Sequence, residues 1–289
     1  MTDMMKRTAT TLTLPALFAF FLAFFLGFMA SAGAQETRLQ NYNFEEVSPV
    51  LWQLPKQLKD ISGLALTPDS RLFAHQQKRG IVWEIDWQKG TLGKSFHLGK
   101  GVKSDFEGIA IVGTRFYMVT RKGGVVHFRE GFAGEGKPFS TYDTGAGNFC
   151  ETEGVTGRPG TTELLLLCRK PKKGAPENQI TIFAWDTVAK QEVTAPFLVI
   201  PLPPELEGVQ PSGIEAWADG SGFLVIATGE RFLIDIGWDG VIRGWRTFPK
   251  GLHKNPAGLT ITRAGDIIIA DQGSPAQVTV YQTNLPEEN

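Results

Sequence analysis

Short apolar segments separated by polar, glycine-rich turns follow one another from about residue 50 to the end of the chain. Polar and apolar side chains alternate in 179–182 (QITI), and segments such as 115–120 (RFYMVT) are rich in β-branched and aromatic residues. This pattern favours β-strands over helices. The chain is therefore predicted to be all-β and to consist of many short strands.

A five-residue motif introduces successive groups of strands: a polar residue, any residue, a small residue or Glu, then Gly and an aliphatic residue. Its glycines are separated by 45, 46, 59 and 45 residues and are Gly63, Gly108, Gly154, Gly213 and Gly258. In each repeat two further strands follow the motif strand, and in the first four repeats a weaker fourth strand follows these. Four antiparallel strands in a unit of this length form one blade of a β-propeller, so we predict a five-bladed propeller.

The fifth repeat lacks a fourth strand, because the chain ends soon after Tyr281. Residues 44–54, which include Val50, Leu51 and Trp52, belong to no repeat. We predict that this N-terminal segment completes the last blade as its outer strand, which would tie the two ends of the ring together and remove an open edge. A β-sandwich is the alternative for an all-β chain, but it does not explain a five-fold period.

The first residues have the pattern of an export signal. Lys6 and Arg7 precede an almost wholly apolar run over 12–29, and the small residues of 32–34 (AGA) follow it. This order predicts a signal peptide over 1–34, cleavage after Ala34, and a propeller domain over 35–289 in the periplasm or outside the cell. An uncleaved anchor is the alternative, since the apolar run could nearly span a bilayer. No later segment is apolar enough to cross a membrane.

Charge changes the picture only by exclusion. The chain has 29 basic and 30 acidic residues and a net charge of -1, which argues against a nucleic-acid partner held by a large positive field. The sequence also lacks a nucleophile elbow, a P-loop and a dinucleotide fingerprint. None of its four histidines has the spacing of metal ligands. Whether the protein is an enzyme is left open by these observations.

The two cysteines, Cys150 and Cys168, are equally distant from a predicted turn at 157–160. Residues equidistant from the turn of an antiparallel hairpin face each other, so the two sulfur atoms are expected to meet. Export would permit a disulfide between them. Two buried thiols are the alternative, because free cysteine packs as a small hydrophobic residue.

The five motifs occur in an order that resembles the SdiA-regulated domain family: 60–64 (DISGL), 105–109 (DFEGI), 151–155 (ETEGV), 212–215 (SGIE) and 257–259 (AGL). The resemblance covers roughly residues 45–282. It implies an exported bacterial five-bladed propeller, distantly similar to NHL repeats, with a calcium site and no known substrate. The family pattern often has Glu before the last motif glycine, where this chain has Ala257, so one expected metal ligand is missing.

The motif residues also predict an acidic ring. The first strand of each propeller blade lines the central channel, so the residues three and one before each motif glycine should gather near one mouth. Like charges this close need protons, basic partners or a cation. A set of oxygen ligands without Cys or His suits Ca²⁺ better than Zn²⁺. The candidate metal ligands are Asp60, Asp105, Glu107, Glu151, Glu153 and, two residues after its glycine, Glu215.

Basic residues provide the alternative to a metal. They follow the second strand of each blade, which returns to the same mouth, and they include Arg121, Arg169 and Arg231. These side chains could neutralise the acidic ring as ion pairs, or bind an anionic ligand. We therefore predict an exported, non-catalytic propeller that binds Ca²⁺ and an unknown small-molecule or protein ligand at the channel mouth. The alternative function is a Ca²⁺-dependent hydrolase of esters, lactones or phosphoesters.

Overall fold

The computed structural model describes residues 37–44, 50–174, 176–229, 232–249 and 251–284. The chain divides into two units, Met1–Gln35 and Glu36–Asn289, and all described residues belong to the second unit. The predicted signal peptide over 1–34 lies outside the described residues. None of the helices in the described segments has the length and apolar character needed to cross a membrane.

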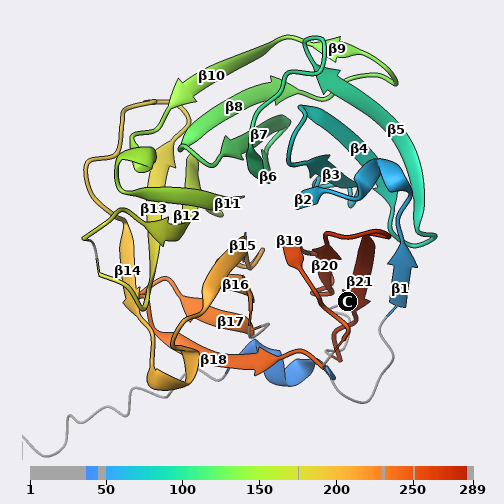
Figure 1. The fold of residues 1–289 in the computed structure, drawn as a ribbon. Coiled ribbons are helices and arrows are strands. Elements are labelled where there is room, and N and C mark those ends of the chain that lie inside the picture. Colours follow the sequence, from blue (N-terminus) through green and yellow to red (C-terminus); the bar gives the residue numbers. More distant parts are fainter. Residues whose placement is uncertain (1–36, 45–49, 175, 230–231, 250, 285–289) are drawn as a thin grey trace, which may run out of the picture. The chain divides into compact units, whose positions relative to one another are not determined.

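Five sheets are arranged in a ring, and each sheet has four antiparallel strands (Figure 1). The first three blades, from the inner strand outwards, are β2 (Ile61–Leu66), β3 (Leu72–Gln76), β4 (Ile81–Asp86) and β5 (Thr91–Leu98); β6 (Phe106–Val112), β7 (Arg115–Thr120), β8 (Gly124–Arg129) and β10 (Phe139–Asp143); and β11 (Cys150–Gly157), β12 (Glu163–Pro171), β13 (Gln179–Asp186) and β14 (Leu198–Pro201). A two-residue strand, β9 (Gly136–Lys137), extends the first blade by pairing in parallel with β5.

The fourth and fifth blades complete the ring. Their strands are β15 (Gln210–Ala216), β16 (Gly222–Thr228), β17 (Phe232–Gly237) and β18 (Ile242–Thr247); and β19 (Pro256–Ile261), β20 (Ile267–Asp271), β21 (Gln277–Tyr281) and β1 (Val50–Gln53). The predicted closure is confirmed, because β1 is the outer strand of the last blade and pairs with β21 from Val50↔Val280 to Gln53↔Gln277. Residues 45–49 of the predicted segment lie outside the described residues.

The core consists of five apolar clusters, one between each pair of neighbouring blades. Between the first two blades, for example, the rings of four buried phenylalanines meet: Phe73, Phe96, Phe116 and Phe128. A strand in a propeller is buried on both faces by the neighbouring blades, and this burial supplies most of the favourable free energy of the fold. Each blade is thus stabilised through its two neighbours.

The motif glycines lie where neighbouring inner strands approach each other most closely. A Cβ atom on Gly108 would lie 2.9 Å from the backbone nitrogen of Val155, and one on Gly154 would lie 3.2 Å from Gly213 Cα. The contacts of the other three glycines continue around the ring: Gly63 with Ile109 N, Gly213 with Ala257 O, and Gly258 with Gly63 C. The motif therefore needs Gly for close backbone approach around the channel.

Each inner strand also carries a β-bulge at its motif. The register with the second strand shifts just before the glycine in all five blades. Bulges leave one residue out of the ladder and redirect its side chain. In the second and third blades the residues at the bulge are Glu107 and Glu153. Neither has a partner residue on the second strand.

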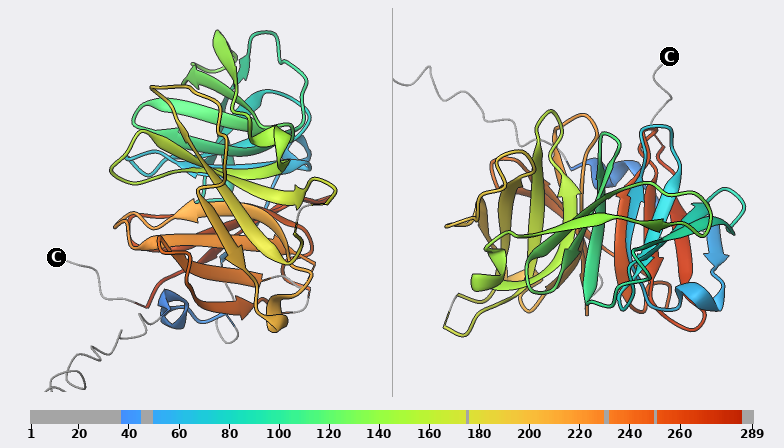
Figure 2. Two further views of the ribbon diagram at one scale, coloured as in Figure 1. Left: turned by 90° about the vertical axis from the view of Figure 1, so that its left-hand side faces the viewer. Right: turned by 90° about the horizontal axis from the view of Figure 1, so that it is seen from above.

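The first described segment, 37–44, contains the 3₁₀ helix η1 (Arg38–Asn41), which lies beside β18 (Figure 2). Leu39, Tyr42 and Phe44 are buried in the cluster between the fourth and fifth blades. The buried carboxylate of Asp235 on β17 accepts hydrogen bonds from Thr37 Oγ1 at 3.0 Å and from the Arg38 backbone nitrogen at 3.1 Å. This segment, which the sequence pattern did not predict, attaches the start of the described residues to two blades.

Cys150 and Cys168 form the predicted disulfide, which joins β11 to β12 with a Cα–Cα distance of 5.8 Å. The two residues were expected to lie directly opposite each other, but they do not. Two register shifts in β11 place Cys150 opposite Pro171 and Cys168 opposite Thr152. The disulfide is therefore diagonal, and simple counting from the turn found the right pair because a bulge moves the register by only a few residues.

Candidate functional site

The inner strands all begin at one end of the channel, and the second strands return to that end. We call the group formed there by Glu107, Glu153, Arg121 and Arg169 the charged mouth. The two glutamates come from the bulges of β6 and β11, whereas Arg121 directly follows β7 and Arg169 lies near the end of β12. Each arginine meets the glutamate of its own blade, because the first two strands of a blade form an antiparallel hairpin.

Both glutamates of the charged mouth are buried and each is paired with an arginine. Arg121 Nη2 donates to Glu107 Oε1 at 2.5 Å, and Arg169 Nη1 donates to Glu153 Oε1 at 2.6 Å. The glutamate side chains are only 2% and 9% exposed, whereas the two arginines are about one-third exposed. Gln77 Nε2 donates to both carboxylate oxygens of Glu107 at 3.2 Å. The carboxylates thus form the floor of the mouth and the guanidinium groups reach the solvent.

The second oxygen of Glu153 differs from the others. Glu153 Oε2 is buried and has no hydrogen-bond partner among the described residues. Burial and the nearby charge of Glu107 raise the pKa of Glu153 to about 7, although Arg169 and Arg121 act in the opposite direction. Burial also raises the pKa of Glu107. The charged mouth therefore contains one carboxylate that lacks full compensation.

The outer acidic residues are more exposed. Asp105 is half-exposed and accepts a hydrogen bond from Lys78 Nζ at 2.7 Å, which holds the pKa of that carboxyl below its usual range. Glu151 Oε2 lies 3.6 Å from Arg121 Nη1. Asp60 is partly exposed at the start of β2. Arg231, which was predicted to bind a ligand, lies outside the described residues.

The structure thus brings Glu107, Glu151 and Glu153 together with Arg121 and Arg169, and the ion pairs match the alternative to a metal. In the described part of the chain, no three His, Cys, Asp or Glu side chains are close enough to hold a metal ion on their own. Calcium binding stays a prediction, and a cation here would need further ligands from water or a bound molecule.

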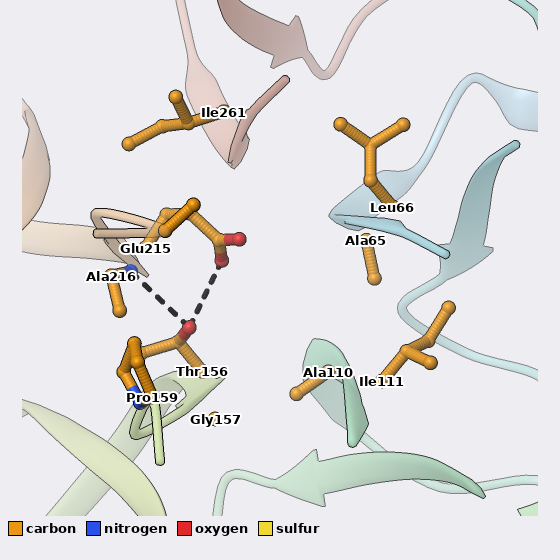
Figure 3. Close-up of a pocket in the computed structure, with 11 residues that line it drawn as sticks. Ala65, Leu66, Ala110, Ile111, Thr156, Gly157, Pro159, Glu215, Ala216 and Ile261 are labelled. Carbon is orange, nitrogen blue, oxygen red and sulfur yellow. Dashed lines mark hydrogen bonds between the residues drawn. The ribbon is translucent and has the colours of Figure 1, made fainter. Parts of the chain in front are cut away.

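Glu215 is not part of the charged mouth. It lies three positions further along its inner strand than the bulge residue, roughly 10 Å at 3.3 Å per residue, towards the opposite end of the channel. There it lines a cavity of about 180 Å³, which we call the channel pocket (Figure 3). All five inner strands contribute to this pocket, through the residues that lie two and three positions after the motif glycines: Ala65, Leu66, Ala110, Ile111, Thr156, Gly157, Glu215, Ala216 and Ile261.

The carboxylate of Glu215 points into the channel pocket and is held by Thr156 (Figure 3) and by Thr260. Thr156 Oγ1 donates to Glu215 Oε2 at 3.1 Å, and Thr260 Oγ1 donates to Oε1 at 3.4 Å. Thr156 Oγ1 in turn accepts a hydrogen bond from the Ala216 backbone nitrogen at 3.3 Å. Burial raises the pKa of Glu215 to about 8, more than the two hydrogen bonds lower it. The position of Glu215 after its glycine, rather than before it, was the sequence signal for this separation.

A further group of titratable residues lies inside the last blade. His253 Nδ1 lies 2.6 Å from Asp271 Oδ2, and His253 Nε2 lies 2.8 Å from the Tyr281 hydroxyl. All three side chains are buried, and Asp271 also accepts a hydrogen bond from the Asn255 backbone nitrogen. His253 is fully buried and the Asp271 side chain is only 4% exposed, so we assign this network a structural role in holding 253–255 against β20 and β21.

Comparisons with known proteins agree with the fold. No family model matches the chain, and no curated protein matches it. Among solved structures, Myxococcus xanthus glutaminyl cyclase is similar with a TM-score of 0.56 and 12% identity, over 82% of this chain and 96% of that one. A virginiamycin B lyase from Staphylococcus aureus is similar with a TM-score of 0.41 and 14% identity, over 83% of this chain and 75% of that one. At 12% identity the likeness to the glutaminyl cyclase shows a shared fold and assigns no function to this chain.

Proposed function

We propose that this propeller is a non-catalytic binding protein that takes Ca²⁺ and a small ligand at the charged mouth. The observation that supports this proposal is the unpartnered oxygen of Glu153, which is buried beside a second carboxylate. A buried carboxylate oxygen without a partner is costly, and a bound cation removes that cost. The fold alone would not suggest this site, since propellers serve many functions.

The groups around Glu153 suit a hard cation with open coordination positions. Glu153 Oε2, the carboxylate of Glu107 and the hydroxyl of Ser62, which donates to Glu107 at 3.5 Å, would all offer oxygen to a cation. Ca²⁺ takes 6–8 oxygens, more than these side chains supply, so water or the ligand itself would complete the shell. The exposed edges of Arg121 and Arg169 would then receive an anionic group of the ligand.

Calcium titration of chelator-treated protein tests the proposal. We expect Ca²⁺ to release or absorb heat on binding and to raise the melting temperature, because a ligand that binds only the folded state stabilises it. Glu153→Gln should lose both effects. Glu163→Gln is the control, since Glu163 forms the same kind of ion pair, at the same 2.6 Å, with Arg158 away from the charged mouth, although its side chain is more exposed than that of Glu153. Absence of heat and of a melting shift in the unaltered protein would remove calcium from the proposal.

A Ca²⁺-dependent hydrolase is the second candidate, and the same oxygen of Glu153 favours it. A carboxylate with a free oxygen beside a bound cation could accept a proton from an attacking water. Phosphoester, lactone and aryl-ester substrates, assayed with and without Ca²⁺, would test this activity. Loss of turnover in both Glu107→Gln and Glu153→Gln would support the placement, whereas unchanged turnover in these variants would contradict it.

We also propose that the protein works in the periplasm or outside the cell. The disulfide between Cys150 and Cys168 supports this, because structural disulfides persist in oxidising compartments. Cell fractionation and N-terminal sequencing of the mature protein test the proposal. A first residue at or next to Gln35 is expected, and a full-length chain in the cytoplasm would contradict it.

A further inference from the structure

The channel pocket has the features of a second binding site, separate from the charged mouth. We propose that it binds a short alkylammonium ion, whose N–H groups bond to the Glu215 carboxylate and whose alkyl part lies against the apolar wall. This site requires neither Ca²⁺ nor Arg121 and Arg169. Binding at the channel pocket can therefore be tested independently of the proposed function.

Glu215 has no cationic partner among the described residues. At the charged mouth each buried glutamate has an arginine within 2.6 Å. Among the described residues, Glu215 has two threonine hydroxyls as partners and no ion pair. Each hydroxyl can satisfy one lone pair of one oxygen, so both oxygens keep acceptor capacity on the side of the cavity. A carboxylate with this arrangement is prepared to accept hydrogen bonds from a cationic donor.

The side chains that line the channel pocket are mostly apolar and leave room for a short alkyl chain. Apart from Glu215 and Thr156, the lining side chains are apolar or absent, and they include Leu66, Ile111 and Ile261. Figure 3 shows the Glu215 carboxylate facing these side chains across the cavity. A volume of about 180 Å³ equals about six waters at their share of ≈ 30 Å³ in the liquid. This space suits a chain of a few carbon atoms and excludes a drug-sized ligand.

Other classes of ligand fit the channel pocket less well than a primary ammonium ion. An anion would be repelled by Glu215, and a calcium ion would find far fewer than its 6–8 oxygens here. A quaternary ammonium ion lacks N–H donors and is usually recognised by aromatic rings, of which the pocket lining has none. A neutral alcohol of the same shape could fill the cavity but would leave the carboxylate uncompensated. The primary ammonium group alone matches both the charge and the acceptor geometry.

Calorimetric titration at pH 8.5 tests the proposal, because an alkylamine with a pKa near that of lysine, about 10.4, remains protonated there. The probes are n-butylammonium, n-butanol and tetramethylammonium. We expect n-butylammonium to bind the unaltered protein at least about tenfold more tightly than the other two, since a hydrogen bond between charged groups contributes roughly 1.5–3 kcal/mol. Glu215→Gln should weaken n-butylammonium binding by a similar factor.

Two further variants separate the pocket from indirect effects. Glu205→Gln removes an exposed glutamate in the 3₁₀ helix η4 (Pro204–Leu206) and should leave n-butylammonium binding unchanged. Ala218→Leu narrows the exposed rim of the pocket while Glu215 stays in place, and it should weaken binding of n-butylammonium. Equal affinity for n-butanol, equal affinity in Glu215→Gln, or no heat with the unaltered protein would overturn the proposal. Calcium titration of the same Glu215→Gln sample shows separately whether the charged mouth still works.

Discussion

Glu215 is a residue whose ionised form opposes folding. Its carboxylate faces the channel pocket, the residue is only partly exposed, and among the described residues it has no cationic partner. Burial raises its pKa to about 8. The unfolded chain would hold the same carboxyl at its ordinary pKa of 4.5. A raised pKa in the folded state means that the folded chain binds the proton more tightly, so stability is complete below about pH 4.5 and declines as the pH rises through 8.

Glu215→Gln should therefore stabilise the protein at high pH. Because glutamine cannot ionise, the variant lacks the decline, and at pH 9 its free energy of unfolding should exceed that of the unaltered protein by a few kcal/mol, at most about 5. At pH 5 the two should differ little. Urea unfolding at both pH values measures this, with Glu205→Gln as the surface control. Equal stabilisation at pH 5 and pH 9 would mean that charge is not the cause.

At the residue level the sequence repeat located the charged mouth but not the channel pocket. Glu107 and Glu153 precede their motif glycines, and both lie where the repeat predicts. Glu215 follows its glycine, and a count of acidic residues near the motif placed it in the same ring. Three residues along a strand are enough to move a side chain from one end of a short channel towards the other. Which carboxylates have cationic partners depends on contacts between blades, which a single repeat does not contain.

At the scale of elements, the start of the described chain is held by the buried carboxylate of Asp235, among other contacts. Thr37 Oγ1 accepts a hydrogen bond from the Leu39 backbone nitrogen at 3.2 Å and donates one to Asp235 Oδ2 at 3.0 Å. It therefore caps η1 and connects it to the buried carboxylate of the fourth blade. Trp217 Nε1 donates to the other oxygen of Asp235 at 3.1 Å. This carboxylate and three buried apolar side chains help to hold the segment 37–44, together with contacts such as the hydrogen bond from the Tyr42 hydroxyl to Gly265 O.

Thr37→Val should test how strongly this segment holds the two blades together. The change keeps the shape of the side chain but removes both hydrogen bonds, so we expect a loss of about 1–3 kcal/mol in the free energy of unfolding. Thr37→Ser keeps the hydroxyl and is the matched control, with an expected change below about 0.5 kcal/mol. Urea denaturation of both variants measures the difference. Equal stability of the two would show that the hydroxyl of Thr37 contributes nothing to this attachment.

The elements that the sequence predicted are those with a periodic pattern. The periodic segments of the five repeats form the strands of the four-stranded blades. They do so because their apolar side chains are buried against a neighbouring blade. The elements that it missed are short, and they include η1 and β9, which have four and two residues. Neither is long enough to show a period. Their positions depend on partners far away in sequence, Asp235 for η1 and β5 for β9.

At the scale of the whole molecule, the ring is closed twice. The motif glycines bring each inner strand against the next, and the contact of Gly258 with Gly63 closes this inner circle. On the outside, β1 joins β21 and so connects the two ends of the described chain in one sheet. A ring held only at the inner circle would leave β21 as an open edge, which exposes backbone groups to pairing with other chains.

The outer closure can be tested with proline, because the backbone groups of β1 alternate between β21 and the solvent. Leu54 N donates to Ala276 O at 2.7 Å, so by alternation the backbone of Trp52 faces Val278 and that of Leu51 faces outwards. Trp52→Pro should thus lower the free energy of unfolding by at least about 2 kcal/mol more than Trp52→Ala, which loses the ring but keeps the N–H. Leu51→Pro should cost much less, since proline is tolerated where an edge-strand N–H faces solvent. Thermal and urea unfolding measure all three variants. If Leu51→Pro were as harmful as Trp52→Pro, the hydrogen bonds of β1 would not be what closes the outer ring, and side-chain packing against the last blade would have to do so.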